Sequence, residues 1–435
     1  MKQRQELKTR PAYLDKLLAV KDNGLIKVIT GMRRCGKSSL LALLAQRLVD
    51  DGIPEDHIIT INLESFQYHA YSADRLYRRI DELTQGDGRH YLLLDEVQLV
   101  DGWEQAVNAL RVDKDIDIYL TGSNAHLLSS QLATLLSGRH VEIRVFPLSF
   151  REFLNYAGID DSPAARTAAF ERYTRYGGLP PVVDQGTNQM LAHTVLSGIY
   201  DTILMRDIAQ YLQIRNPMVF NDVTRYLADT AGSPVSISNI EHRLKSAHRP
   251  TANETIERYI SGLLDAFLFY RAQRINVKGG GYLQGLSKYY PADLGIRNML
   301  LGYPAGDFGF LLENVVHNEL RTRGYDVQVG KMDNLEIDFV ATRIGDDLAQ
   351  ERLFIQVSAS ILDAHTRARE LEPLQRLRRL GVGGADGVGA GGVGVGGGVG
   401  VGGGRRIVLT LDTFGLGTTD DGIAIVNALD WLLER

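Results

Sequence analysis

An eight-residue segment near the N-terminus has the residue types and spacing of a loop that binds a chain of phosphates. It reads Gly31-Met32-Arg33-Arg34-Cys35-Gly36-Lys37-Ser38 and fits the pattern G-x-x-x-x-G-K-[ST] at every fixed position. The glycines let backbone N–H groups face inward, toward a phosphate at a helix N-terminus. We expect the Lys37 ammonium to reach the β- and γ-phosphates and the Ser38 hydroxyl to ligate Mg²⁺. The other loop residues and Ser39 are expected to line the same nucleotide.

The segments that flank the loop are those that the motif requires. Residues 25–30 are an apolar run typical of a strand, and residues 38–44 follow the period of a helix. A chance glycine-rich turn before a helix is the alternative interpretation. The strand–loop–helix setting favours phosphate binding.

Two acidic residues follow another apolar run. Residues 91–94 predict a strand buried on both faces, as in a parallel sheet, and Asp95 and Glu96 come directly after it. We expect Asp95 to hold Mg²⁺ through water and Glu96 to orient the water that attacks the γ-phosphate. The alternative is a helix N-cap pair, but the position downstream of a phosphate loop favours the catalytic interpretation.

Two more polar residues lie beside predicted strands. Ser123 follows the strand at 116–120, where it would lie between Glu96 and the γ-phosphate and sense hydrolysis; a plain turn fits the sequence equally well. Arg139 precedes an alternating run at 141–145 that predicts a fifth strand. It suits an arginine finger offered to a neighbouring subunit, with an ordinary surface arginine as the alternative.

Composition and charge limit the class of protein. The chain has 435 residues, of which 44% are hydrophobic and 23% charged, so we expect a soluble protein of two to four domains. A net charge of -5 argues against a uniformly basic nucleic-acid binder but permits a local basic patch. The single cysteine, Cys35, precludes an intrachain disulfide, and a reducing compartment suits the chain. With no secretory signal and no membrane-spanning apolar run, we expect a cytoplasmic protein that does not bind membranes.

Four segments together resemble the bacterial and archaeal AAA+-type ATPases that carry a DUF4143 C-terminal region. They are the phosphate loop and residues 92–98, 121–123 and 146–153. The resemblance extends from about residue 10 to residue 411. It implies an α/β fold in which residues 1–155 form an ASCE/AAA+-like P-loop NTPase with a five-stranded parallel sheet, using ATP and Mg²⁺. The strand that ends at Asp95 is then not adjacent in sequence to the phosphate-loop strand.

Residues 156–215 are interpreted as a helical lid or linker. The turn cluster at 172–181 is similar to the Gly-x-Pro element of related signalling ATPases, in which a proline packs on the adenine; that residue would be Pro180. A simple helix stop is the alternative. Helical patterns continue over residues 191–213. They include Arg206-Asp207, which resembles a recurrent Lys/Arg-Asp pair without assigned chemistry.

Residues 216–300 predict a winged helix-turn-helix: three helices followed by a hairpin with a Gly279-Gly280-Gly281 tip. The segment carries several cationic side chains: Arg243, Lys245, His248, Arg249, Arg258, Arg271, Arg274 and Lys278. Such a face could contact DNA phosphates, with the helix that starts near residue 253 in the major groove. The alternative is that the unit mediates protein contacts.

Residues 301–435 look like a restriction-endonuclease core. Glu313 on a helix and Asp338 on a strand match the metal-binding acids, and Gln356 on the next strand matches the third ligand. Ser358 stands where active members have a lysine, so we expect the fold to be retained and DNA cleavage to be lost. Residues 381–404 form an atypical insertion of glycine and valine without a functional account.

The leading hypothesis is a Mg²⁺-ATP-dependent ATPase that couples hydrolysis to rearrangement of a winged-helix and nuclease-like module. The alternatives are a DNA-binding regulator that ATP switches, and a nuclease of a defence system. ATP is the expected ligand, and DNA, protein partners and a homo-oligomer are candidate partners. The sequence does not reveal the biological process.

Overall fold

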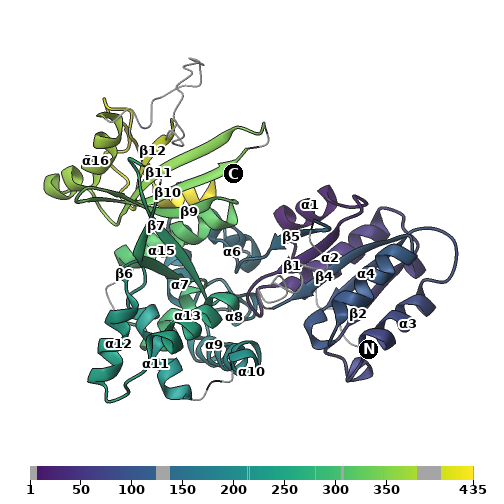
Figure 1. The fold of residues 1–435 in the computed structure, drawn as a ribbon. Helices are drawn as coiled ribbons and strands as arrows, with labels where there is room; N and C mark the ends of the chain where they lie inside the picture. The colour runs from purple at the N-terminus through teal and green to yellow at the C-terminus, as the bar shows by residue number, and fades with distance from the viewer. Residues whose placement is uncertain are drawn as a thin grey trace, which may run out of the picture.

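The computed structural model describes residues 7–123, 138–212, 214, 216–279, 281–304, 308–345, 347–379 and 403–434. Within these residues the chain forms one β-sheet in each half, with a helical segment between them (Figure 1). The predicted glycine- and valine-rich insertion at 381–404 lies outside the described residues, except for its last two positions.

The N-terminal sheet has five parallel strands in the order β2-β3-β4-β1-β5. Their bounds are β1 Ile26–Thr30, β2 Ile58–Asn62, β3 His90–Asp95, β4 Ile116–Gly122 and β5 His140–Arg144. Strand β4 separates β1 from β3, so the phosphate-loop strand and the strand that ends at Asp95 are not neighbours. The five-stranded parallel core that the family resemblance implies is therefore confirmed.

Helices cover both faces of this sheet, which explains why every residue of the inner strands β1 and β3 is buried (Figure 1). Helices α1 (Pro11–Ala19) and α2 (Lys37–Asp50) pack on one face, and α3 (Ala73–Leu83) and α4 (Trp103–Asp113) pack on the other. Successive residues of β3 alternate between the two cores: Leu92 and Leu94 face α3 and α4, whereas Tyr91 and Leu93 face α2. Short 3₁₀ turns, η1 (Glu55–His57), η2 (Phe66–Tyr68) and η3 (Val97–Leu99), interrupt the connections.

The helical segment between the sheets begins at α6 (Phe150–Ala157), where Ser149 and Glu152 form a capping box. It continues through α7 (Pro163–Tyr176), α8 (Pro180–Val183), α9 (Gln189–Thr202) and α10 (Ala209–Leu212). Between α9 and α10 the residues Ile203–Ile208 form a π-helical turn, η5. Such turns occur frequently at functional sites because they displace side chains from the regular helical register.

The C-terminal half begins with α11 (Pro217–Asp229), β6 (Pro234–Val235), α12 (Ile237–Ser246), α13 (Asn253–Asp265) and the hairpin of β7 (Phe269–Asn276) and β8 (Tyr282–Pro291). It continues with α14 (Leu294–Leu301), α15 (Phe308–Thr322), β9 (Asp326–Met332), β10 (Leu335–Ile344), β11 (Gln350–Ser358) and α16 (Ala364–Arg379). The last elements are β12 (Arg405–Thr410), β13 (Gly417–Thr418), β14 (Ala424–Asn427) and α17 (Ala428–Leu433).

The strands of this half form one nine-stranded sheet in the order β13-β14-β12-β11-β10-β9-β7-β8-β6. Strand β7 pairs in parallel with β9, so the hairpin joins the strands that follow α15. The predicted boundary at residue 300 therefore falls within a unit that shares one set of backbone hydrogen bonds. Division of the chain into four domains remains a prediction.

A shared apolar core connects the N-terminal half with the helices of the C-terminal half. It combines Met32 of the phosphate loop and Phe146 with Ile203 and Ile208 of η5, and it continues into α11, α13 and α14. Phe146 also contacts the ring of Tyr270 edge-on, at 5.6 Å between centroids. Residues of η5 and α13 therefore pack in the same core.

A buried ion pair fixes the centre of the N-terminal sheet. Lys27 of β1 donates a hydrogen bond to Asp117 of β4, and both side chains are almost completely buried. The Tyr119 hydroxyl and the backbone N–H of Asp22 also donate to Asp117, at 2.9 and 3.1 Å. Burial lowers the pKa of Lys27, and the carboxylate of Asp117 opposes that effect. Removal of either partner would leave a charge without compensation in the sheet.

We expect Asp117→Ala to destabilise the N-terminal sheet by about 3–5 kcal/mol, because it leaves the Lys27 ammonium buried and unpaired. Asp115→Ala is the matched control, since Asp115 forms an exposed ion pair with Arg89 and its loss costs about 1 kcal/mol or less. Urea unfolding followed by circular dichroism measures both. Equal losses in the two variants would contradict this account of the buried pair.

Candidate functional site

Both glycines of the phosphate loop have a positive φ, and at Gly31 a side chain would also collide with the fold. Gly31 has φ +143°, and a Cβ atom there would lie 2.1 Å from the carbonyl oxygen of Val145. Gly36 has φ +107° and begins α2; a Cβ atom would lie 4.0 Å from Cγ of Pro180. Because both conformations favour glycine, the loop geometry follows directly from the motif.

The loop presents one buried cation and two accessible hydroxyls. The Lys37 side chain is buried, and its ammonium donates to the carbonyl oxygens of Gly31 and Met32 at 2.9 and 3.1 Å. Ser38 and Ser39 are exposed in the first turn of α2. A cation across the loop and a free hydroxyl at the helix start are the groups that phosphate and Mg²⁺ require.

Arg10 supports the loop from behind and was not predicted from the sequence. Its guanidinium donates to the carbonyl oxygens of Cys35 and Phe146, both at 3.0 Å. The same group binds Glu152 at 2.9 and 2.6 Å, so a nearly buried arginine connects the loop with α6. No local motif marks Arg10, because its partners come from distant parts of the chain.

The two acids after β3 are buried beside the loop and held by β4. The Thr121 hydroxyl donates to Asp95 and accepts the backbone N–H of Glu96 at 3.0 Å. Glu96 has φ +59°, a left-handed conformation that is unusual for a residue other than glycine. This turn separates the directions of the two carboxylates, and such strain is typical of functional sites.

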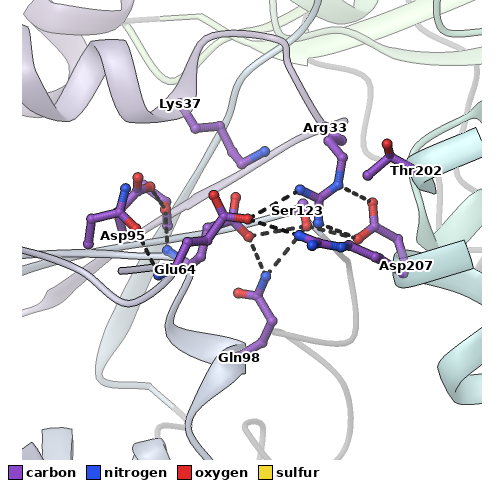
Figure 2. A network of polar contacts seen from close by, with 12 residues as sticks. Arg33, Lys37, Glu64, Asp95, Gln98, Ser123, Thr202 and Asp207 are labelled. Atoms are coloured by element: carbon purple, nitrogen blue, oxygen red, sulfur yellow. Dashed lines mark hydrogen bonds and ion pairs between the residues drawn. The ribbon is translucent and has the colours of Figure 1, made fainter. Parts of the chain in front are cut away.

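Ser123 lies between Glu96 and the helical segment. Its hydroxyl is 3.3 Å from Glu96 Oε2 and 3.3 Å from Asp207 Oδ1, and the Gln98 amide contacts both Glu96 and the hydroxyl (Figure 2). The side chain is buried. The structure therefore places Ser123 next to Glu96, and its role in sensing hydrolysis stays a prediction.

Arg33 and Asp207 form the strongest polar contact between the phosphate loop and the helical segment. The guanidinium donates twice to the carboxylate, at 3.0 and 2.8 Å, and both side chains are largely buried (Figure 2). Glu64 lies 3.7 Å from Arg33 and 3.4 Å from Arg206. Burial acts to lower the pKa of Arg33, but the hydrogen bonds and charge of Asp207 raise it overall.

Cys35 and Pro180 complete the surroundings of the loop. Cys35 is buried, and burial raises the pKa of its thiol, so it serves as a packing residue. Pro180 begins α8 next to Gly36, and the backbone before it is held by Asp293, which accepts the N–H of Gly178 at 2.8 Å. Burial raises the pKa of Asp293 to about 6.

Arg139 lies apart from this cluster. Its carbonyl oxygen accepts the N–H of Ile26 at 2.9 Å, and its guanidinium is 3.4 Å from Asn108. It therefore sits at the start of β1, whereas the phosphate loop follows the end of β1. Five residues of strand separate the two positions by about 16 Å, so Arg139 does not belong to the site of its own subunit.

A second polar cluster lies in the C-terminal sheet. The ammonium of Lys288 on β8 is 3.2 Å from Glu313 and 3.0 Å from Glu336. The Tyr290 hydroxyl donates to Glu313 at 2.7 Å. These acids raise the pKa of Lys288 against the opposing effect of burial. Ser358 carries no positive charge, and the hairpin brings one to these acids through Lys288. No pattern in the sequence indicated this contact.

The strand residues of this cluster are bound to one another. Asp338 accepts the N–H of Val357 at 2.8 Å, and Gln356 accepts the N–H of Asp338 at 2.9 Å while donating to Glu370. Burial and the nearby Glu313 raise the pKa of Asp338. The Ser358 hydroxyl instead donates to the carbonyl oxygen of Ser360 at 3.0 Å. Across the described residues, no group of three or more His, Cys, Asp or Glu side chains is arranged to hold a metal ion.

The parallel sheet, its phosphate loop and the helices that cover it match a P-loop AAA+ fold. Residues 23–154 match the family model "AAA domain" (AAA_14), and residues 167–307 match a domain of unknown function, DUF8612. The sequence resemblance led us to expect DUF4143 in the second region, and the matching model is a different one. In the part of the chain that the structure describes, no helix is long and apolar enough to span a membrane.

An uncharacterized protein of Haemophilus influenzae is 37% identical to this chain, over 98% of each sequence. The chain therefore belongs to the same family as that protein. Uncharacterized protein MJ1544 of Methanocaldococcus jannaschii is 28% identical over 75% of this chain and 74% of its own length.

Among solved structures, the Aeropyrum pernix ORC1 protein in complex with DNA is 14% identical, with a TM-score of 0.32 over 68% of this chain and 93% of its own. DnaA from Aquifex aeolicus bound to AMPPCP is also 14% identical, with a TM-score of 0.28 over 58% of this chain and 86% of its own.

Proposed function

We propose that the N-terminal domain binds and hydrolyses ATP with Mg²⁺ and that hydrolysis moves the C-terminal half. The observation that carries this proposal is the convergence of Lys37, Ser38, Asp95, Glu96 and Ser123 at one edge of the parallel sheet. The tight glycine turns at 31 and 36 leave a backbone cradle of the kind that phosphate fills. Mg²⁺ would screen the phosphate charge when it is bound.

Each residue has a distinct role in this proposal. Lys37 neutralises the terminal phosphates, Ser38 and Asp95 hold Mg²⁺, and Glu96 orients the attacking water. Thr121 fixes both acids through its hydroxyl, and Ser123 contacts Glu96. Pro180 of α8 contributes an apolar surface beside Gly36, which suits the edge of the adenine pocket.

We infer that α11–α13, β6 and the β7–β8 hairpin form a winged helix-turn-helix that transmits motion rather than one that reads DNA. Several of its cationic groups are already paired with acids: Arg249 with Asp222, Arg274 with Glu336, and Lys278 with Asp333. These ion pairs reduce the charge available for phosphate contacts. An ATPase assay with and without DNA tests the alternative, since stimulation by DNA would favour the ATP-switched regulator.

Lys37→Ala is expected to weaken ATP binding about tenfold or more, because a hydrogen bond to a charged group contributes about 1.5–3 kcal/mol. Glu96→Gln is expected to retain binding but to reduce turnover by about 100-fold or more, because the carboxylate that orients water is lost. Equilibrium binding and phosphate release measure the two effects. Hydrolysis by Glu96→Gln at the wild-type rate would show that this carboxylate has another role.

If Arg139 acts on a neighbouring subunit, Arg139→Ala should reduce hydrolysis by about 10³-fold while ATP affinity is unchanged. Mixing Arg139→Ala with Glu96→Gln protein should restore part of the activity, because one interface then combines an intact arginine with an intact carboxylate. Arg111→Ala, in the last turn of α4, is the control for loss of a nearby arginine. Full activity of a strictly monomeric protein in light scattering would exclude the arginine finger.

We propose that the C-terminal cluster stabilises the fold and does not cleave DNA. Lys288 and Tyr290 already occupy Glu313, so a metal ion would have to displace both. Three interactions from the hairpin, two from Lys288 and one from Tyr290, thereby engage Glu313 and Glu336, and the positive charge lies on the acids rather than beside an attacking water. The cluster connects β8 with α15.

We expect no cleavage of plasmid or linear DNA, single- or double-stranded, with Mg²⁺ or Mn²⁺ and with or without ATP. Lys288→Ala should instead destabilise the C-terminal sheet by about 3–5 kcal/mol, because it leaves the partly buried carboxylates of Glu313 and Glu336 without their cation. Lys331→Ala, on β9, is the matched control. Cleavage that disappears in Asp338→Ala would promote the nuclease to the leading hypothesis.

A further inference from the structure

We propose that Asp207 is the residue through which the helical segment distinguishes ATP from ADP. This inference rests on the proposed function and assigns chemistry to a residue outside the phosphate loop and the acids of β3. Asp207 lies on η5, and its carboxylate contacts Arg33 of the phosphate loop and Ser123 after β4. These two partners follow the adjacent strands β1 and β4.

The contacts of Asp207 form a continuous polar path to the water-orienting carboxylate. Arg33 donates both of its hydrogen bonds to Asp207, and Ser123 lies at 3.3 Å from both Asp207 and Glu96 (Figure 2). The Ser123 hydroxyl has one proton, so it donates to one of these carboxylates at a time. A change at Glu96 or at the terminal phosphate therefore alters the hydrogen bonds available to Asp207.

Electrostatics gives this contact its dependence on the nucleotide. Arg33 is in the same phosphate loop as Lys37, four positions before it, so its guanidinium is a second cation of the loop that a terminal phosphate would attract. Asp207 and a γ-phosphate are both anions, and they compete for Arg33 and for the Ser123 hydroxyl. Repulsion between two anions in a largely buried site is only weakly screened. ADP lacks the competing group, so Asp207 retains both partners with ADP.

The apolar core packed against η5 would turn the loss of the Asp207 hydrogen bonds into a movement of this turn. Ile203 and Ile208, on the same turn as Asp207, are fully buried in the core that contains Phe220 of α11 and Leu263 of α13. A π-helical turn is strained relative to an α-helix, and Arg33 helps to hold it. Release of Asp207 would let η5 shift, and the packed core would carry that shift to α13.

Linkage makes the coupling reciprocal: if a γ-phosphate weakens the Asp207 contacts, Asp207 must weaken the binding of ATP relative to ADP. Asp207→Asn removes the charge but keeps an oxygen that can accept from Arg33. It should therefore bind AMPPNP at least about fivefold more tightly than wild type, with a smaller change for ADP. Asp201→Asn is the matched control, because it removes an exposed carboxylate from the end of α9.

Calorimetric titration of AMPPNP and ADP, each with Mg²⁺, measures these affinities in the full chain. Amide hydrogen exchange of wild-type residues 203–208 is the second readout: it should be faster with AMPPNP than with ADP, and it does not depend on folding of a variant. Unchanged or weaker AMPPNP binding by Asp207→Asn, or equal exchange with both nucleotides, would overturn the inference. Failure of the wild-type chain to bind either nucleotide would instead overturn the proposed function.

Discussion

Parallel pairing of β1, β3 and β4 is the constraint on which the rest of the N-terminal half depends. Parallel strands end at the same edge of a sheet, so the phosphate loop, the acids after β3 and Ser123 after β4 meet there. The register places Thr30 beside Gly122 and Leu94 beside Leu120. The buried pair of Lys27 and Asp117 fixes β1 against β4 from within. Loss of that register would separate the loop from the acids.

Contacts with the helical segment extend this edge into the rest of the chain. Arg10 holds the loop from the side of α6, and Asp207 holds it from the side of η5. Arg10 is nearly buried, and its charge is neutralised. Asp207 instead places an anion beside the loop that is expected to bind phosphate. Met32, Phe146 and η5 share one apolar core with α11 and α13, so the loop packs against the helices of the C-terminal half.

In the C-terminal half, a charge that is absent at one position of the sequence is supplied by a residue from another part of the fold. Ser358 lacks the charge that a nuclease core would require, and Lys288 supplies a positive charge from a strand of the preceding hairpin. That is possible because β7 pairs with β9 and makes the hairpin part of the same sheet. The Lys288 ammonium contacts the acids directly. This contact accounts for a stable core and supports a structural role for the positive charge.

Local patterns in the sequence determined the phosphate loop, the five strands of the N-terminal sheet and the acids at 95 and 96. These features depend on residues close together in the chain: a glycine that needs positive φ, an apolar run, or an acid directly after a strand. The same patterns predicted Ser123 beside Glu96, because parallel strands end together. The role of Pro180 at the adenine stays a prediction; the structure places this residue beside Gly36.

Only the tertiary structure determined which residues connect these separate parts of the chain. Arg33 and Asp207 are 174 positions apart, and Arg10 and Glu152 are 142 apart, so no periodicity links them. The tertiary structure also placed Arg139 at the end of β1 away from the phosphate loop, and it brought Lys288 into contact with Glu313. Such pairs depend on how helices and sheets pack, and packing is set by the summed burial of many side chains. A motif predicts the chemistry of a loop, but the fold determines which residues pair with the charged side chains of that loop.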